Sequence, residues 1–177
     1  MKLIRQSPDV FLAPGPVCTI GDEEVAFIKN AAIKSAKGRA RINAHPDGDD
    51  TLHEMVIAIR RDSYIRPHRH PGKSEAFHMV QGAVDIVIFD DSGDLRDVVR
   101  LGAPGGDRAF YYRVSIPLFH TLLIRSNILV VHEITNGPFV PGAAIFAPFA
   151  PDESDTSAAE HYLGELDRRV TAFARWP

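Results

Sequence analysis

A short run of chain from residue 68 to residue 82 limits the folds open to this sequence more than any other feature. It begins with His68-x-His70, continues through Pro71-Gly72 and reaches Glu75. On a β-strand, side chains two positions apart share a face and lie about 6.6 Å apart, so two imidazoles can converge on one cation. The Pro-Gly pair favours a turn that returns the Glu75 carboxylate to the same place. The run therefore predicts two strands, a turn and a metal site.

The length and composition of the chain indicate one globular domain. It has 177 residues, of which 45% are hydrophobic and 24% charged. A net charge of −3 without a basic cluster argues against nucleic acid as a partner. No stretch approaches the ~20 apolar residues of a membrane span, and prolines interrupt the N-terminal region, so we expect no membrane partner and no signal peptide. The single cysteine, Cys18, suits a reducing compartment, and we expect a cytoplasmic protein.

The pattern of apolar residues predicts a helix followed by many short strands. Residues 1–38 are expected to form a Pro-rich, irregular extension and then a helix that begins near Asp22 and ends at Lys37-Gly38. From residue 39 to residue 151, alternating or β-rich runs are separated by turn clusters. Strands at this spacing favour an antiparallel sandwich or barrel over a parallel sheet.

The last segment, residues 152–177, predicts a second helix. Ser157-x-x-Glu160 has the form of a capping box, and apolar residues recur on one face from Ala159 to Phe173. We expect this helix to pack on the barrel, so that the three segments form one structural domain.

The spacing His68-x-His70, four residues, Glu75, six residues, Gly82 matches the first motif of the cupin superfamily, whose members are small β-barrels that hold a metal inside. Asp62 stands where that motif opens with a glycine, and the second motif lacks its glycine before His120. The resemblance implies a mainly β fold, the cupin double-stranded β-helix or jelly-roll barrel, here with an N-terminal and a C-terminal α-helix.

Three stretches more narrowly resemble the WbuC-type cupin-fold metalloproteins. They are Arg41-Ile-Asn43-Ala-His45, Pro67-His-Arg-His-Pro-Gly-Lys-Ser-Glu75 and Phe146-Ala-Pro-Phe-Ala-Pro151. That family is associated with bacterial surface-polysaccharide gene clusters. The resemblance spans roughly residues 39–151 and implies a metal-binding cupin without a settled reaction. Cupins resembling this chain are often dimers, so we also expect a homodimer.

His120 is our candidate for a fourth metal ligand, because three ligands from one run need a partner on an opposing strand. The alternative is a buried structural histidine bonded to a backbone carbonyl. His68, His70, Glu75 and His120 together offer three imidazoles and one carboxylate, which suit one divalent transition metal: Fe, Mn, Ni, Co or Zn. His78 faces the other way on a regular strand and is expected at the surface.

Strand parity adds three candidate substrate-binding residues. Tyr64 and Arg66 share the face of the paired histidines, and Arg66 could bind an anionic group, with a solvated surface arginine as the alternative. Gln81 shares the face of Glu75 if the second strand is regular.

Glu133 is the candidate catalytic residue. A two-residue turn at Ser126-Asn127 would pair the two strands around it and place Glu133 opposite His120, facing the metal. There it could act as a general base or orient a ligand. A different loop length would instead turn His132 inward.

Two functions of different classes follow. The first is a metalloenzyme that acts on a small polar substrate, such as a sugar or sugar nucleotide in surface-polysaccharide metabolism. Isomerase or epimerase chemistry and Fe(II)-type oxygenase chemistry would both suit its site. The second is a non-catalytic module that binds a sugar or a small acid with the help of the metal.

Overall fold

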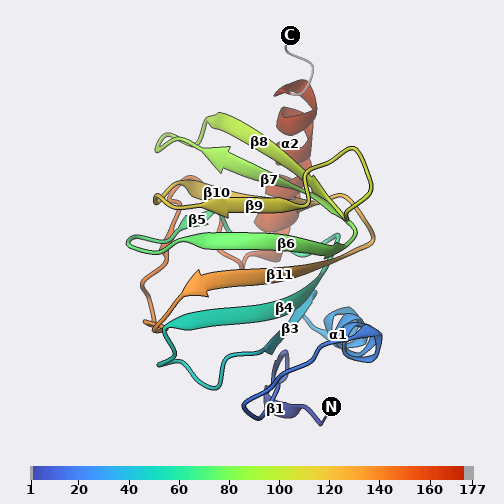
Figure 1. Ribbon diagram of the computed structural model, residues 1–177. Coiled ribbons are helices and arrows are strands. Elements are labelled where there is room, and N and C mark those ends of the chain that lie inside the picture. The colour runs from blue at the N-terminus through green and yellow to red at the C-terminus, as the bar shows by residue number, and fades with distance from the viewer. Residues whose placement is uncertain (1, 174–177) are drawn as a thin grey trace.

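The computed structural model describes residues 2–173 and shows two β-sheets, with one helix packed beside each (Figure 1). One sheet has seven strands in the order β1-β2-β3-β4-β11-β6-β9, and the other has five in the order β12-β5-β10-β7-β8. The elements are β1 (Ile4–Ser7), β2 (Val10–Leu12), α1 (Asp22–Lys34), β3 (Arg39–Asn43), β4 (Leu52–Arg60), β5 (His68–Arg69), β6 (Glu75–Gln81), β7 (Ala83–Phe89), β8 (Leu95–Gly102), β9 (Tyr111–Val114), β10 (Phe119–Ile124), β11 (Ile128–Asn136), β12 (Ile145–Phe146) and α2 (Thr156–Phe173).

From β4 onward the chain passes from one sheet to the other at nearly every connection. Strands β4, β6, β9 and β11 belong to the larger sheet, whereas β5, β7, β8, β10 and β12 belong to the smaller one. The strand pairs are antiparallel except for β2 with β3. Because successive strands alternate between the sheets, the two sheets wind around a shared interior as a jelly roll. The mainly β fold expected from the sequence is confirmed.

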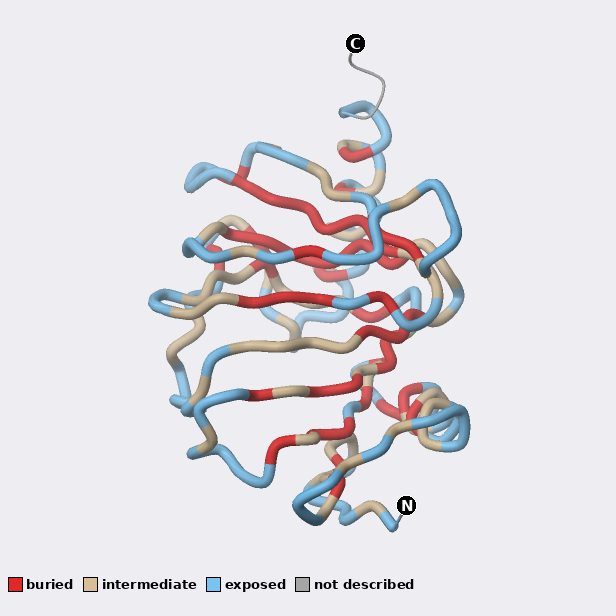
Figure 2. The backbone as a smooth tube through the Cα atoms, viewed as in Figure 1, coloured by how far each residue is buried: buried red, intermediate tan, exposed pale blue. Residues whose placement is uncertain are grey.

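The interior between the sheets is filled by alternate residues of both. Phe77, Met79 and Val131 from the larger sheet pack there against Ile86 and Leu122 from the smaller one. This alternation follows from the two-residue period of a strand. Buried segments accordingly run along the strands, and exposed segments concentrate in the connections (Figure 2).

Each helix covers the outer face of one sheet. Ile28 and Ala32 of α1 pack against outward-facing residues of β3, β4 and β11, and Leu166 and Val170 of α2 pack against those of β7 and β10. Figure 1 shows the two helices at opposite ends of the molecule. Within the described residues, no helix is both long enough and apolar enough to cross a membrane.

The N-terminal residues are more regular than expected. In place of an irregular extension they form β1 and β2, and β2 joins the larger sheet alongside β3. Helix α1 ends at Lys34, where the Ser35 N–H donates to Ala31 and Ala32, and not at Lys37-Gly38. The backbone turns away there because Ser35 adopts an extended conformation.

Helix α2 begins one residue before the expected capping box. The Asp155 carboxylate accepts the Ala158 N–H at 3.0 Å, as an N-cap residue does. Asp155, and not Ser157, therefore caps the helix, which packs on the barrel as expected.

Candidate metal centre and its cavity

Two of the predicted ligands, His68 and His120, lie side by side on the inner face of the smaller sheet. His120 on β10 is the antiparallel partner of His68 on β5, and their ring centroids are 4.9 Å apart. His120 is 1% exposed. Its neighbours two and four positions along, Leu122 and Ile124, belong to the interior core, so the alternation of the strand carries His120 inward.

The other two predicted ligands reach the same point from the connection after β5 and from the larger sheet. The turn at Pro71-Gly72 forms as expected, with Gly72 at a φ of +74°, and leads to Glu75 at the start of β6. His70 Nε2 lies 3.2 Å from Glu75 Oε2, and His120 Nε2 lies 3.2 Å from Glu75 Oε1. One potential ligand atom from each of the four residues lies within 4.8 Å of the other three. Closure of the two sheets thus assembles the cluster.

Backbone carbonyls orient two of the imidazoles. His68 Nδ1 lies 2.9 Å from the Arg66 carbonyl oxygen, and His120 Nδ1 lies 3.0 Å from that of Leu118. A carbonyl oxygen only accepts, so in each ring Nδ1 carries a proton, and in the neutral ring Nε2 keeps its lone pair for the cluster. Metal-binding histidines in proteins are held in this way.

The cluster fits a cation because its buried acceptors face one another. Glu75 is 4% exposed, and neither its Oε1 nor His120 Nε2 has an aligned hydrogen-bond partner among the described residues. A neutral His120 presents a lone pair to that carboxylate oxygen, which is unfavourable unless a positive charge lies between them. Three imidazoles and a carboxylate suit a divalent transition metal.

The ionisation of the cluster is consistent with a site for positive charge. Burial would raise the pKa of Glu75, but His120 and His70 outweigh it and hold that pKa well below its usual range. Burial lowers the pKa of His68 to about 4, helped by the charge of His120. Burial also acts to lower the pKa of His120, yet the adjacent Glu75 carboxylate raises it overall. At neutral pH, Glu75 is therefore anionic and His68 neutral.

A cavity of about 670 Å³ extends from the four side chains, and an adjoining cavity of about 300 Å³ shares Arg41, His70, Glu75 and Glu133 with it. Volumes of this size hold small-molecule ligands in other proteins. Phe139 and Phe146 lie at the edge, where they are more than half exposed.

Glu133 faces this cavity, but not for the reason expected. Strands β10 and β11 lie in different sheets, so the predicted pairing of His120 with Glu133 is wrong. Glu133 pairs instead with Met55 of β4 and Phe77 of β6, both inward-facing core residues. Burial, and then the charge of Glu75, raises the pKa of Glu133 to about 8. Its carboxyl group therefore mostly keeps its proton at pH 7, and His132 faces outward.

Tyr64 and Arg66 both contact the segment before α2. Of the two, only Arg66 lines the larger cavity. The Tyr64 hydroxyl donates to the Pro151 carbonyl oxygen at 3.0 Å. Arg66 lines the larger cavity, but its guanidinium donates to Asp152 at 2.8 Å and lies 5.3 Å above the Phe146 ring. The Arg66 charge is already partnered, so it is less suited to bind an anion than its position predicted.

The structure does not bring Gln81 to the cavity. Its side chain is exposed and accepts a hydrogen bond from Lys29 of α1 at 3.0 Å. Val131 pairs with Met79 and Val130 pairs with Gln81, which makes Val80 the extra residue of a β-bulge. The bulge breaks the alternation that aligned Gln81 with Glu75. His78, before the bulge, is exposed as expected.

Sequence reasoning missed several cavity residues on β3 and β4. Arg41 and Asn43 line the cavity from β3, and Met55 lines it from β4. The signal available was weak, because β3 alternates over only five residues. Arg41 and Asn43 belong to one of the stretches that resemble the WbuC-type proteins, and that resemblance implies no role for either.

Comparisons with known proteins give a fold but no activity. A family model described as "Domain of unknown function (DUF6016)" matches residues 20–101. No curated protein matches significantly. Among solved structures, protein SO0799 from Shewanella oneidensis is similar with a TM-score of 0.50 and 12% identity, over 70% of this chain and 77% of that one.

Two enzymes are also among the similar structures, at lower scores. An oxalate oxidase in complex with the substrate analogue glycolate gives a TM-score of 0.48 at 12% identity, over 75% of each chain. The Bacillus subtilis oxalate decarboxylase gives 0.42 at 16%, over 55% of this chain and 24% of that one.

The alternation of strands between two sheets, with the histidine cluster between them, decides the architecture. The fold is a cupin-type jelly-roll barrel. In this cupin fold the cluster lies where both sheets contribute side chains to the interior.

Proposed function

We propose that this protein is a metal-dependent cupin enzyme that acts on a small polar molecule, such as a sugar or sugar nucleotide. The main evidence for a metal is that two buried atoms, Glu75 Oε1 and His120 Nε2, lie 3.2 Å apart. Neither has an aligned hydrogen-bond partner among the described residues. A role in surface-polysaccharide metabolism rests on the resemblance of three sequence stretches to the WbuC-type proteins.

In this proposal the chain's own residues divide the work. His68, His70, Glu75 and His120 hold the ion, which supplies Lewis-acid polarisation of a ligand oxygen. Glu133, on the same cavity wall as Glu75, holds a proton at neutral pH and exchanges it with a bound ligand. Isomerase or epimerase chemistry and Fe(II)-type oxygenase chemistry remain the candidate reaction classes.

The second candidate function is a non-catalytic module that binds a sugar or small acid. The position of Glu133 favours the enzyme, because a binding module has no need of a half-buried carboxyl group with a raised pKa in its cavity. Replacement of Glu133 by Gln would separate the two: an enzyme would lose turnover and still bind its ligand, whereas a binding module would show no turnover in either form.

The metal is tested by elemental analysis of protein purified without a histidine tag. We expect about one transition metal per chain in the wild type and its loss in His68→Ala and His120→Ala. The matched control is His78→Ala, because His78 lies on β6 with Glu75 but faces outward. A wild type that stays metal-free after reconstitution would remove the catalytic proposal.

The homodimer implied by the resemblance remains part of this proposal. Size-exclusion chromatography with light scattering would test it, and a monomeric mass at micromolar concentration would contradict it.

A further inference from the structure

The smaller cavity has the features of a separate binding site beside the metal-type cluster. We call it the side chamber; it is lined by Arg41, Asn43, His45, His53, Lys73 and, at the wall shared with the cluster, Glu133. Its volume of about 300 Å³ accommodates one end of a sugar-sized molecule. A ligand that reaches the cluster can therefore extend into the side chamber.

Arg41 lies on the inner face of the larger sheet. It pairs with Ile57 of β4, and Ile57 pairs with Val131 of β11, which is fully buried in the interior core. Partners in adjacent strands share a face, so Arg41 lies on the inner face with them. Its side chain is exposed and lines both cavities.

Within residues 2–173, the charge of Arg41 has no partner. Among the described residues its guanidinium makes no hydrogen bond or ion pair, whereas Arg39 is bonded to Glu153 at 2.8 Å and Arg66 to Asp152 at 2.8 Å. The Arg41 charge is therefore available to a ligand in the two cavities that it lines.

The stacked His45 and His53 rings form a fixed wall of the same chamber. His53 is 5% exposed, and its Nε2 has no hydrogen-bond partner among the described residues. Its ring stacks on His45 with centroids 4.1 Å apart and an interplanar angle of 3°, so it cannot turn away easily. That Nε2 nitrogen has almost no accessible surface and lies beside Gly137, so the His53 ring shapes the chamber wall and Arg41 supplies the binding group.

We propose that the side chamber binds an anionic group of the substrate, a carboxylate or a phosphate, with Arg41 as its principal partner. The substrate class is then a small polar molecule with one acidic end, such as a sugar acid or sugar phosphate, whose hydroxyl-bearing end reaches the four-residue cluster. This identification of a substrate rests on the proposed function, but the anion site itself requires no metal. The planar guanidinium suits two oxygens of either group.

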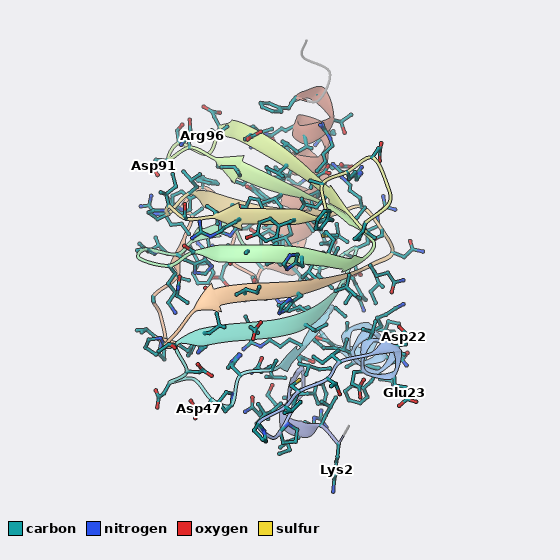
Figure 3. All side chains as sticks on the ribbon, in the orientation of Figure 1. Lys2, Asp22, Glu23, Asp47, Asp91 and Arg96 are labelled. Atoms are coloured by element: carbon teal, nitrogen blue, oxygen red, sulfur yellow. The ribbon has the colours of Figure 1, made fainter. Side chains whose placement is uncertain are left out.

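The test is isothermal titration calorimetry with inorganic phosphate, malonate and malonamide, the uncharged counterpart of malonate. Metal-loaded and chelator-treated proteins are both titrated. The variants are Arg41→Gln, Arg41→Lys and the control Arg96→Gln, whose exposed side chain lies near the hairpin between β7 and β8 (Figure 3). Metal content and the thermal unfolding midpoint are recorded for every variant, so that a folding defect is recognised.

We expect at least one anion to bind the wild type and malonamide not to bind. Arg41→Gln should weaken anion binding about tenfold or more, because a hydrogen bond to a charged group is lost. Arg41→Lys should recover part of that loss, and Arg96→Gln should leave binding unchanged. The stronger binding of phosphate or of malonate identifies the acidic group.

Two outcomes separate this inference from the proposed function. Anion affinity unchanged in Arg41→Gln, or no anion binding to a wild type that holds one metal per chain, overturns the anion site and leaves the metal proposal standing. Arg41-dependent binding by a wild type that holds no metal supports the anion site and overturns the metal role.

Discussion

His120 on β10 and His68 on β5 are direct antiparallel partners, with ring centroids 4.9 Å apart. Backbone pairing therefore sets the separation of two imidazoles that lie far apart in the chain. Both rings also donate from Nδ1 to a backbone carbonyl, which leaves Nε2 directed at the cluster. The cluster is consequently held in place by the barrel's own hydrogen bonds.

Removal of the metal should destabilise the wild type but not His120→Ala. A ligand that binds only the folded state stabilises it by about 2.7 kcal/mol at 100 times its dissociation constant. For a chain of this size that corresponds to a fall in Tm of roughly 5–10 °C on chelation. Thermal unfolding with and without a chelator measures it, and His78→Ala should behave as wild type. An equal fall in His120→Ala would exclude His120 as a ligand.

Replacement of Glu133 by Gln should stabilise the metal-free protein at high pH. Burial and the charge of Glu75 raise the folded-state pKa of Glu133 from 4.5 to about 8. A raised pKa means that the folded state holds the Glu133 proton more tightly than the unfolded state does. The stability that this proton gives the folded state is fully present below pH 4.5 and is lost as pH rises through about 8. The amide side chain of the variant cannot ionise, so the variant should escape the loss.

Urea unfolding in chelator at pH 5, 7 and 9 measures this effect. The two proteins should differ least at pH 5, and the variant should exceed the wild type by about 1 kcal/mol or more at pH 9. Glu165→Gln, on the exposed face of α2, is the control and should track the wild type. A constant difference across the three pH values would show that Glu133 is not an inward, proton-holding carboxyl group.

Replacement of Gly82 by Ala should disturb the connection between β6 and β7. Gly82 has a φ of +88°, and an added Cβ would lie 2.7 Å from the Ile128 carbonyl oxygen, a backbone atom. Gly105 has a similar φ of +95° but open space around the added Cβ. We expect Gly105→Ala to cost about 1 kcal/mol from backbone strain alone, and Gly82→Ala about 3 kcal/mol or more. Denaturant unfolding measures the loss of stability in each variant. Equal losses in Gly82→Ala and Gly105→Ala would contradict the prediction, because they would mean that the close contact at residue 82 costs no stability.

Truncation of Leu166 to Ala should show that α2 is part of the folded barrel. Leu166 is 1% exposed between α2 and the outer face of the smaller sheet, so the cavity should cost about 2–5 kcal/mol. Phe173, at the end of the same helix, is 40% exposed, and Phe173→Ala should cost much less. A single cooperative unfolding transition in both variants would indicate one structural unit, whereas a separate early loss of helix would contradict it.

Local chemistry in the sequence determined the strand pattern and three of the four cluster residues. His68, His70 and Glu75 fall within eight positions, so strand alternation and the Pro71-Gly72 turn suffice to bring them together. The positive φ of Gly82 has the same local origin, because only glycine adopts it without strain. These features depend on neighbours in the chain and can be predicted from them.

Tertiary structure alone decided the rest. A short connection can close a hairpin or cross between sheets. Residues 125–127 cross from β10 to β11, so Glu133 faces inward through β4 and β6 and not through β10. The bulge at Val80 turned Gln81 outward, and the pairing of β3 with β4 turned Arg41 inward. Register between distant strands is set by the packing of the whole barrel, and the alternation within one strand does not encode it.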